Sequence, residues 1–304
     1  MSANVVEIQG LDRRFGKKAA LEGIDLAVPK GVVLGLVGAN GAGKTTLIKH
    51  LLGLLKAQTG TVRVFGLDPV RYPAEVLGRI GYLSENRELP EWMRVGELLR
   101  YTQAFYPAWD VLYAQDLLTL FELNRDQKIK TLSRGQRAQT ALLIALAYRP
   151  DLLLLDEPSS GLDPVVRRDI LAAIVRTVAD EGRTVVFSSH LLDEVERVAD
   201  TVVMIHQGRI VLEDSLDAIK ATHTRLTVRF PQPVASPPAL QGVLSCTGGP
   251  QEWTYVCHNG STDIEHEVEA LHGSVVERAV PTLDEIFVSR VKGPTSPEGS
   301  LCDR

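Results

Sequence analysis

Short apolar segments bounded by glycine and proline recur along the chain from Val5 to about Leu212. Several are continuous runs of leucine or β-branched residues, which is typical of strands covered on both faces of a parallel sheet. A segment of helical period, 44–55, lies between two such runs, and this alternation predicts an α/β fold. We expect strands at 24–28, 32–37, 61–65, 80–83, 152–155, 184–188 and 201–205.

The pattern changes twice along the chain. From about 90 to 148 it is mostly helical, which predicts a helical subdomain inserted into the α/β core. After Lys220 a proline-rich stretch marks a loop, and weaker strand-like segments follow it. We therefore expect a first domain at 1–220 and a small C-terminal α+β domain at 221–291. The last residues, 292–304, are rich in Gly, Pro and Ser and predict a disordered tail.

Composition narrows the possible partners. The 304 residues include 33 Lys and Arg against 38 Asp and Glu, and this slightly acidic balance gives no electrostatic reason to expect a nucleic-acid partner. No run of 18 apolar residues exists, so a membrane role requires a separate partner. The N-terminus lacks a basic region followed by an apolar one, which predicts a cytoplasmic protein. Three cysteines without CxxC spacing favour free thiols over a disulfide framework, and we expect no metal site among them.

The strongest chemical signal is a glycine-rich segment that fits GxxxxGK[ST], placed after a predicted strand and before a predicted helix. Its glycines let backbone N–H groups approach phosphate oxygens, and the helix N-terminus favours negative charge. Lys44 is expected to reach the β- and γ-phosphates, and the hydroxyl of Thr45 to bind Mg²⁺. The predicted nucleotide-binding residues are Gly38, Asn40, Gly41, Ala42, Gly43, Lys44, Thr45 and Thr46.

A second candidate part of the site is acidic. Asp156 and Glu157 follow the apolar run 152–155, at the carboxyl end of a predicted strand. In open α/β sheets, ligands bind in the crevice outside the carboxyl ends of the strands. Asp156 is therefore expected to help hold Mg²⁺, and Glu157 to polarise the attacking water as a general base. An acidic exit from a strand before Pro158 is unremarkable by itself, but beside the glycine-rich segment we favour the catalytic interpretation.

In this order the motifs resemble those of the ATP-binding cassette (ABC) ATPases over about residues 4–220. The resemblance implies a P-loop NTPase core of the RecA-like type with antiparallel N-terminal strands, and ATP as the nucleotide. Leu132-Ser133-Arg134-Gly135-Gln136 stands where the family has LSGGQ, with Arg134 in place of the first glycine. In the family this segment binds the γ-phosphate held by a second protomer, which implies a head-to-tail dimer, most simply a homodimer. The spacing of Ser133 and Gln136 also fits a helix capping box, and the two interpretations are compatible.

Further positions follow from the resemblance. It implies that Asp163 belongs to the D-loop at the dimer interface, although Asp163 before Pro164 is also a good helix start. His190 matches the histidine that contacts the γ-phosphate and orders the water. Phe15 matches an aromatic residue that stacks on adenine. Glu85 replaces the Q-loop glutamine; its oxygen reaches Mg²⁺ or water, but it adds negative charge.

The resemblance implies an ATPase that closes as a dimer around two Mg·ATP and drives an integral membrane permease from the cytoplasmic face of the membrane. Nearby, Trp92 or Met93 is expected to contact the permease. The segment 281–288, an amphipathic helix after Pro281, resembles the closing segment of ATPases serving ABC-2 type exporters, which favours export.

Two alternatives stay open at this point. The first is a soluble ATP-driven remodelling protein acting on ribosomes or DNA. A single cassette, no basic extension and only 112 residues between Lys44 and Asp156 disfavour it. The second is a regulatory module that binds nucleotide and hydrolyses it weakly, which the departures at Glu85 and Arg134 suggest.

Overall fold

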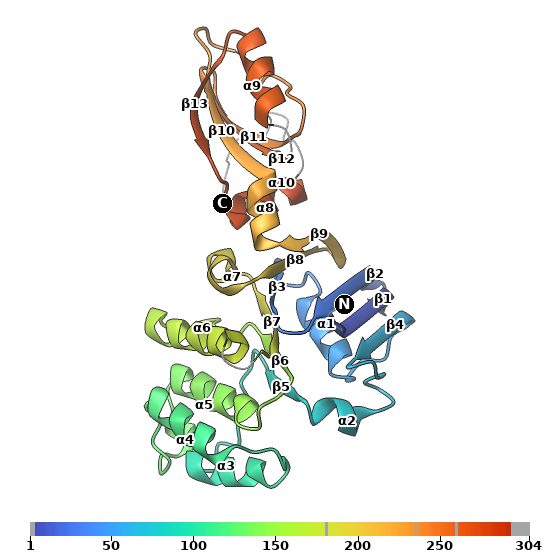
Figure 1. The fold of residues 1–304 in the computed structure, drawn as a ribbon, viewed down its shortest axis with the longest axis vertical. Helices are drawn as coiled ribbons and strands as arrows, with labels where there is room; N and C mark the ends of the chain where they lie inside the picture. Colours follow the sequence, from blue (N-terminus) through green and yellow to red (C-terminus); the bar gives the residue numbers. More distant parts are fainter. Residues whose placement is uncertain (1–3, 180–181, 235, 259–260, 293–304) are drawn as a thin grey trace. The chain divides into compact units, whose positions relative to one another are not determined.

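The computed structural model describes residues 4–179, 182–234, 236–258 and 261–292 (Figure 1). It divides into two compact units, Met1–Glu213 and Asp214–Arg304. Among the described residues, no helix is both long enough and apolar enough to cross a membrane.

The first unit is built on a six-stranded sheet. Its strand order is β5-β6-β7-β3-β8-β9, and the pairs from β5 to β8 are parallel. Every residue of β3, β6 and β7 is buried, as expected for parallel strands covered on both faces. The predicted α/β core is therefore confirmed. The strands are β3 (Val33–Val37), β5 (Ile80–Leu83), β6 (Leu152–Asp156), β7 (Thr184–Ser189), β8 (Thr201–His206) and β9 (Arg209–Ser215).

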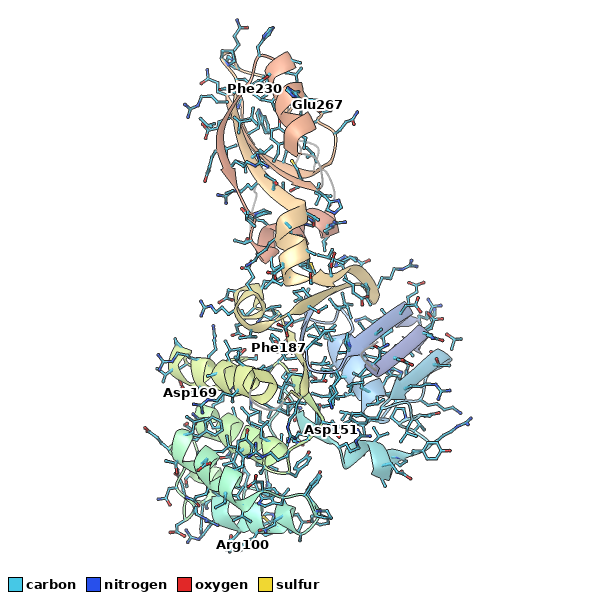
Figure 2. The ribbon with its side chains drawn as sticks, viewed as in Figure 1. Arg100, Asp151, Asp169, Phe187, Phe230 and Glu267 are labelled. Carbon is cyan, nitrogen blue, oxygen red and sulfur yellow. The ribbon has the colours of Figure 1, made fainter. Side chains whose placement is uncertain are left out.

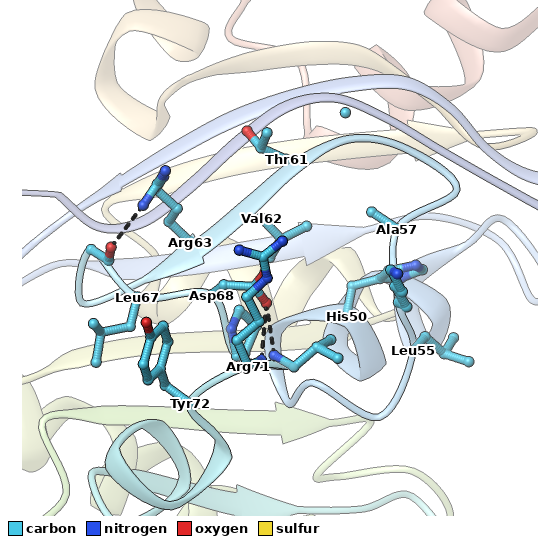
Figure 3. Close-up of a pocket in the computed structure, with 15 residues that line it drawn as sticks. His50, Leu55, Ala57, Thr61, Val62, Arg63, Leu67, Asp68, Arg71 and Tyr72 are labelled. Atoms are coloured by element: carbon cyan, nitrogen blue, oxygen red, sulfur yellow. Dashed lines mark hydrogen bonds and ion pairs between the residues drawn. The ribbon is translucent and has the colours of Figure 1, made fainter.

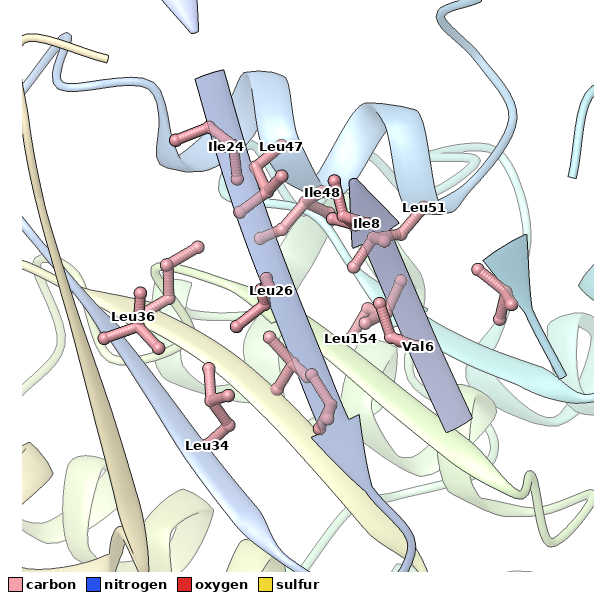
Figure 4. Packing of buried hydrophobic residues seen from close by; sticks show 14 of the residues in the cluster. Val6, Ile8, Ile24, Leu26, Leu34, Leu36, Leu47, Ile48, Leu51 and Leu154 are labelled. Atoms are coloured by element: carbon pink, nitrogen blue, oxygen red, sulfur yellow. The ribbon is translucent and has the colours of Figure 1, made fainter. Parts of the chain in front are cut away.

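A second sheet in this unit is antiparallel, with the order β2-β1-β4. It consists of β1 (Asn4–Phe15), β2 (Lys18–Pro29) and β4 (Thr59–Val64). The helix α1 (Lys44–Leu51) packs with both sheets in one apolar cluster (Figure 4). In that cluster Ile24 of β2 and Leu36 of β3 are fully buried together with Ile48 of α1. This packing fixes α1 at the carboxyl end of β3, where the glycine-rich segment lies.

The helix after that segment is shorter than its apolar period predicts. We expected it to reach residue 55, but α1 ends at Leu51. Gly53 adopts a left-handed φ of 68°, and its N–H bonds the carbonyl of His50, which is a common way to end a helix. A Cβ on Gly53 would stand 2.3 Å from the carbonyl oxygen of Pro69, so only glycine fits this close approach.

The segment predicted to be helical lies between β5 and β6. There α3 and α4 both contact α5, and Figure 1 shows the three helices side by side. Of the two alternatives for a permease contact, Met93 is only 7% exposed and packs into the core, whereas Trp92 is 76% exposed, so only Trp92 is accessible to a partner. The helices are α2 (Pro73–Leu77), α3 (Val95–Gln103), α4 (Val111–Leu120), a 3-10 turn (Ile129–Thr131) and α5 (Arg134–Leu146), followed later by α6 (Pro164–Ala179) and α7 (Leu192–Val198).

The second unit is an α+β arrangement. Its sheet is antiparallel, with the order β11-β12-β10-β13. The apolar core joins this sheet to α9 and includes Val228, Tyr255 and Val268, and Figure 2 shows Phe230 and Glu267 in the same unit. The elements are α8 (Leu216–Thr222), β10 (His223–Arg229), β11 (Val243–Gly249), β12 (Glu252–His258), α9 (Ser261–Ala270), β13 (Ser274–Ala279) and α10 (Leu283–Lys292). The predicted disordered tail lies outside the described residues, apart from Lys292 at the end of α10.

Candidate active site

A pocket of about 390 Å³ lies beyond the carboxyl ends of β3 and β6 in the first unit. Residues from four separate parts of that unit line it, and most of the predicted nucleotide-binding residues are among them. The lining residues are Phe15, Lys18, Ala20, Ala39, Asn40, Gly41, Ala42, Gly43, Lys44, Thr45, Thr46, Glu85 and Glu157.

Two glycines of the loop are required by close packing. A Cβ on Gly38 would stand 2.3 Å from the carbonyl oxygen of Ile205, and one on Gly43 would stand 2.6 Å from that of Ala20. Gly43 also has a φ of 121°, which side chains rarely tolerate, and it directly precedes α1. The loop can therefore lie close to both neighbouring strands and direct the N-terminus of α1 into the pocket.

Lys44 carries a buried ammonium group at the centre of the site. Its side chain is 6% exposed, and its Nζ donates to the carbonyl of Gly38 at 2.6 Å and approaches that of Ala39 at 3.4 Å. The same Nζ lies 3.0 Å from Oε1 of Glu157. A buried cation is stable here because three oxygens surround it.

Asp156 connects the start of α1 to the neighbouring strand β7. Its Oδ1 accepts from the hydroxyl of Thr45 at 3.1 Å and from that of Ser188 at 2.8 Å, and it is 1% exposed. Burial together with the charge of Asp156 raises the pKa of Tyr82 to about 12. Thr45 lines the pocket, and its hydroxyl contacts the buried carboxylate of Asp156; both groups are hard oxygen donors, and such a pair suits Mg²⁺.

Glu157 is held on three sides. Its backbone N–H donates to the hydroxyl of Ser188 at 2.9 Å, and its Oε2 accepts from Nδ1 of His190 at 2.7 Å. Lys44 contacts the other carboxylate oxygen. The backbone of Glu157 has a φ of 50°, a left-handed conformation that turns the chain sharply after β6. A buried carboxylate beside a pocket, oriented by a histidine, has the arrangement required of a general base.

Phe15 and Glu85 lie at the mouth of the same pocket. Phe15 is 48% exposed, and the guanidinium of Arg13 stands 4.7 Å from its ring centroid. Glu85 is exposed in the loop after β5. The ring and the carboxylate thus both face solvent within reach of a ligand in the pocket.

The structure does not bring the LSGGQ-like segment to this pocket. Among the described residues, none from Leu132 to Gln136 lines it. Ser133 and Gln136 form the capping box at the start of α5, with side-chain to backbone bonds of 3.1 and 3.0 Å. Asp163 likewise caps α6 by accepting from the N–H groups of Val165 and Val166.

Three polar residues of the site were not anticipated. Ser188, fully buried, links Asp156 to the backbone of Glu157, and its position at the end of an apolar strand was the only available signal. Glu194 is fully buried, accepts from the hydroxyl of Ser159 and lies 3.1 Å from Arg167; burial raises its pKa. Arg87 lies beneath the loop after β6. In sequence, Glu194 and Arg87 resemble ordinary surface residues.

A larger pocket than this one lies elsewhere in the first unit. It measures about 580 Å³ and lies between the end of α1, β4 and the loop before α2, with His50, Arg63 and Asp68 among its lining residues (Figure 3). None of the predicted site residues lines it. The functional site is therefore located by its buried charges rather than by its size.

Comparisons with known proteins agree with this geometry. The family described as ABC transporter matches residues 21–160. The chain is 36% identical to the daunorubicin/doxorubicin resistance ATP-binding protein DrrA of Streptomyces peucetius, over 71% of this chain and 67% of that one. It is 26% identical to the ABC transporter ATP-binding protein YtrB of Bacillus subtilis, over 95% of this chain and 99% of that one. A solved ATP-binding subunit of an ABC transporter superposes with a TM-score of 0.66 at 28% identity, covering 71% of this chain and 92% of that one.

Proposed function

The chain belongs to the family of ABC transporter ATP-binding proteins, and from that premise we propose that it works as one of two cassettes that hydrolyse Mg·ATP to power a separate membrane permease. Membership in the family makes it a P-loop ATPase subunit that binds ATP. The proposal concerns which of its residues do so, and with which partners. The observation that carries it is the buried constellation of Lys44, Asp156 and Glu157 at one pocket.

For binding, we assign the phosphates to the loop from Gly38 to Thr46 and the adenine to the ring of Phe15. The N-terminus of α1 and the ammonium of Lys44 both favour negative charge at this position. Phosphate oxygens at Lys44 would compete with the carboxylate of Glu157, which now lies 3.0 Å away. ATP binding would thereby release one carboxylate oxygen of Glu157 to face a water molecule.

For the metal, Thr45 and Asp156 are the residues that would hold Mg²⁺. Glu85 lines the same pocket and would contribute an oxygen through a bridging water molecule. The bound ion would offset the charge of the β- and γ-phosphates. The paired hydroxyl and carboxylate support this assignment, because Mg²⁺ takes few protein ligands and keeps several waters.

For hydrolysis, Glu157 accepts the proton of the attacking water through Oε1 or Oε2. The water oxygen bonds to the γ-phosphorus, the bond from that phosphorus to the β–γ bridging oxygen breaks, and ADP and phosphate leave. His190 donates from Nδ1 to Glu157 and keeps the carboxylate oriented, while its side chain stays 39% exposed.

For assembly, we propose that Ser133, Gly135 and Gln136 bind the γ-phosphate held by a second copy, with Asp163 at the same interface. The start of α5 is capped and carries the positive end of its helix dipole, and Ser133 is exposed. Since these residues do not line the pocket of their own chain, they are available to a partner.

For the transporter, we propose an integral permease as the second partner, a location at the cytoplasmic face of the membrane, and export as the direction. Two observations support export. The similar protein DrrA is named for daunorubicin/doxorubicin resistance. Most of the segment 281–288, whose sequence resembles the closing segment of ATPases that serve exporters, lies in the helix α10. We further propose that 1–220 is the ATPase domain and 221–291 an accessory domain. No feature of the site favours a ribosomal or DNA substrate.

The test compares the wild-type chain with Glu157→Gln in ATP hydrolysis and in ATP-dependent dimerisation. We expect the variant to lose about 100- to 10,000-fold in kcat while it still binds ATP and accumulates as a dimer. The control is Glu252→Gln, an exposed glutamate of the second unit that should leave kcat unchanged. A wild-type chain that binds ATP without hydrolysing it would instead identify a regulatory module, and loss of ATP binding in Glu157→Gln would contradict the assigned role.

A further inference from the structure

Arg87 is a buried arginine that has no carboxylate partner among the residues that the structure describes. It lies two residues after Glu85 in the loop that follows β5, and it is 5% exposed although Glu85 and Asn86 face solvent. A turn in which the N–H of Arg87 bonds the carbonyl of Ser84 points the side chain inward, and its backbone has a left-handed φ of 49°. In the described part of the chain, Arg87 forms no ion pair. Such a buried cation is costly unless other groups satisfy it.

Backbone carbonyls of the segment after β6 satisfy its Nη2, whereas its buried Nε has no hydrogen-bond partner in the described part of the chain. Nη2 of Arg87 lies 3.3 Å from the carbonyl oxygen of Glu157, 2.9 Å from that of Pro158 and 3.0 Å from that of Ser160. A planar guanidinium is well suited to bonding several fixed acceptors at once. One side chain therefore holds both the backbone of Glu157 and the turn that leads to the D-loop position.

A second guanidinium lies against the far end of the same segment. A Cβ built on Gly161 would stand 2.4 Å from Cζ of Arg134, so the Arg134 guanidinium packs directly on this glycine. Gly161 has a φ of 65°. Burial and the charge of Arg134 both lower the pKa of Arg87, whereas Glu85 opposes that shift. The segment 157–161 is thus held between an arginine of the β5–α3 loop and one of the α5 N-terminus.

We propose that Arg87 is a positioning residue that fixes the backbone from Glu157 to Ser160, and through it the carboxylate of Glu157, from the loop that carries Glu85. Arg134 holds the other end of the segment. This inference rests on the proposed role of Glu157 as general base. A movement of the β5–α3 loop is thereby transmitted to the hydrolytic carboxylate, because the three carbonyl bonds move with Arg87.

The test combines turnover with hydrogen exchange in Arg87→Met, Arg87→Lys and Arg87→Ala. We expect Arg87→Met to lower kcat about 10- to 100-fold, since a small displacement of a catalytic group costs this much, while KM changes less than about 3-fold. Exchange should quicken in the peptide that contains Ser160 and Leu162, whose N–H groups bond back to Glu157 and Ser159. Arg87→Lys should keep more activity than Arg87→Met, because it retains a cationic donor.

Chemical rescue separates a positioning role from general damage to the fold. Millimolar guanidinium chloride should restore part of the kcat of Arg87→Ala, whereas sodium chloride at equal ionic strength should not. The matched control is Arg63→Ala, an exposed arginine that donates to the carbonyl of Gly66 at 3.1 Å. It should keep wild-type kcat and respond to neither salt.

The outcomes are separable from those of the proposed function. If the wild-type chain does not hydrolyse ATP, the proposed function falls, and the exchange comparison alone decides whether Arg87 holds the segment. If Arg87→Met keeps wild-type kcat or wild-type exchange in that peptide, the inference is overturned. A lowered kcat without rescue by guanidinium and without advantage of Arg87→Lys also overturns it.

Discussion

The two units of the chain place their charges in opposite ways. In the first unit Lys44, Asp156 and Glu157 are each at most 7% exposed and meet at the ends of parallel strands. In the second unit the ion pair between Arg229 and Glu252 lies on the surface of an antiparallel sheet, with side chains that are 61% and 48% exposed. The core of the second unit consists mainly of apolar side chains.

This difference indicates that the first unit binds a charged ligand, whereas the second unit has a structural role. Burying charges is costly, so a fold that keeps several of them at one pocket does so for a ligand that needs them. Surface pairs contribute little to stability and impose no such cost. Changes at the buried charges of the first unit should therefore alter ATP handling, and changes in the second unit should alter stability without altering ATP handling.

The largest expected effect is the loss of ATP turnover in Lys44→Ala. Removing the ammonium leaves the phosphate charge uncompensated, and we expect kcat/KM for ATP to fall about 100- to 1,000-fold, as for the loss of a preorganised donor. Steady-state phosphate release measures this. Lys49→Ala, an exposed lysine on the same helix, is the control and should match wild type. A comparable loss in both variants would show that the effect is not specific to the buried charge.

The next effect is on the stability of the second unit. Val228 is fully buried in its apolar core, and Val228→Ala removes two methyl groups and leaves a cavity. We expect the free energy of unfolding of this unit to fall by about 2 kcal/mol in urea titration, with ATP affinity unchanged. Val276→Ala, on an exposed side chain of β13, should change it far less. Weakened ATP binding in Val228→Ala would contradict the separation of roles.

A smaller effect should appear as a pH dependence of the second unit. His223 is 2% exposed, its Nδ1–H donates to the carbonyl of Ile219, and Nε2 accepts from Arg290. Burial, together with the charges of His258 and Arg290, lowers the pKa of His223 in the folded state.

Because the unfolded chain binds this proton more readily, the free energy of unfolding should decrease as pH falls below about 6.5 toward the lowered pKa, by at most about 1.4 kcal/mol per pH unit. The pKa of His258 is lowered in the same direction and adds to this loss. His223→Gln should flatten the dependence, whereas His266→Gln, on an exposed helix face, should not. Thermal melts between pH 5 and 8 would measure it, and an unchanged slope in His223→Gln would contradict the assignment.

The smallest effect concerns the surface pair of Arg229 and Glu252, whose nearest atoms are 2.7 Å apart. Arg229→Ala should change the free energy of unfolding by less than about 1 kcal/mol, because solvent and side-chain entropy offset the attraction. A double-mutant cycle with Glu252→Ala isolates the pair term, and high salt should reduce it. A coupling above about 2 kcal/mol would contradict this estimate.

Local motifs of the site were predictable because their chemistry follows from neighbouring residues. The glycines at 38, 41 and 43, with Lys44 and Thr45 behind them, define a loop and a helix start within nine residues. The capping box of Ser133 and Gln136 is likewise a three-residue relation, and the structure confirms it. The continuous apolar strands were predictable for the same reason, since covered strands need no alternation.

Contacts between distant segments were not predictable in this way. Arg87 and the carbonyl of Pro158 are 71 residues apart, and Ser159 and Glu194 are 35 apart. In the sequence, Arg87 and Glu194 are indistinguishable from ordinary charged surface residues. Burial of Met93 and the end of α1 at Leu51, where Gly53 packs against Pro69, were also decided by contacts outside their own elements.

The sequence by itself determined the class of the fold, the glycine-rich loop and the acidic strand end, because period, glycine placement and caps act over a few residues. Only the tertiary structure decided which side chains share the pocket and which buried groups support them. The physical reason is that the cost of burying a charge depends on every oxygen and donor around it, and those neighbours come from segments that only the folded chain brings together.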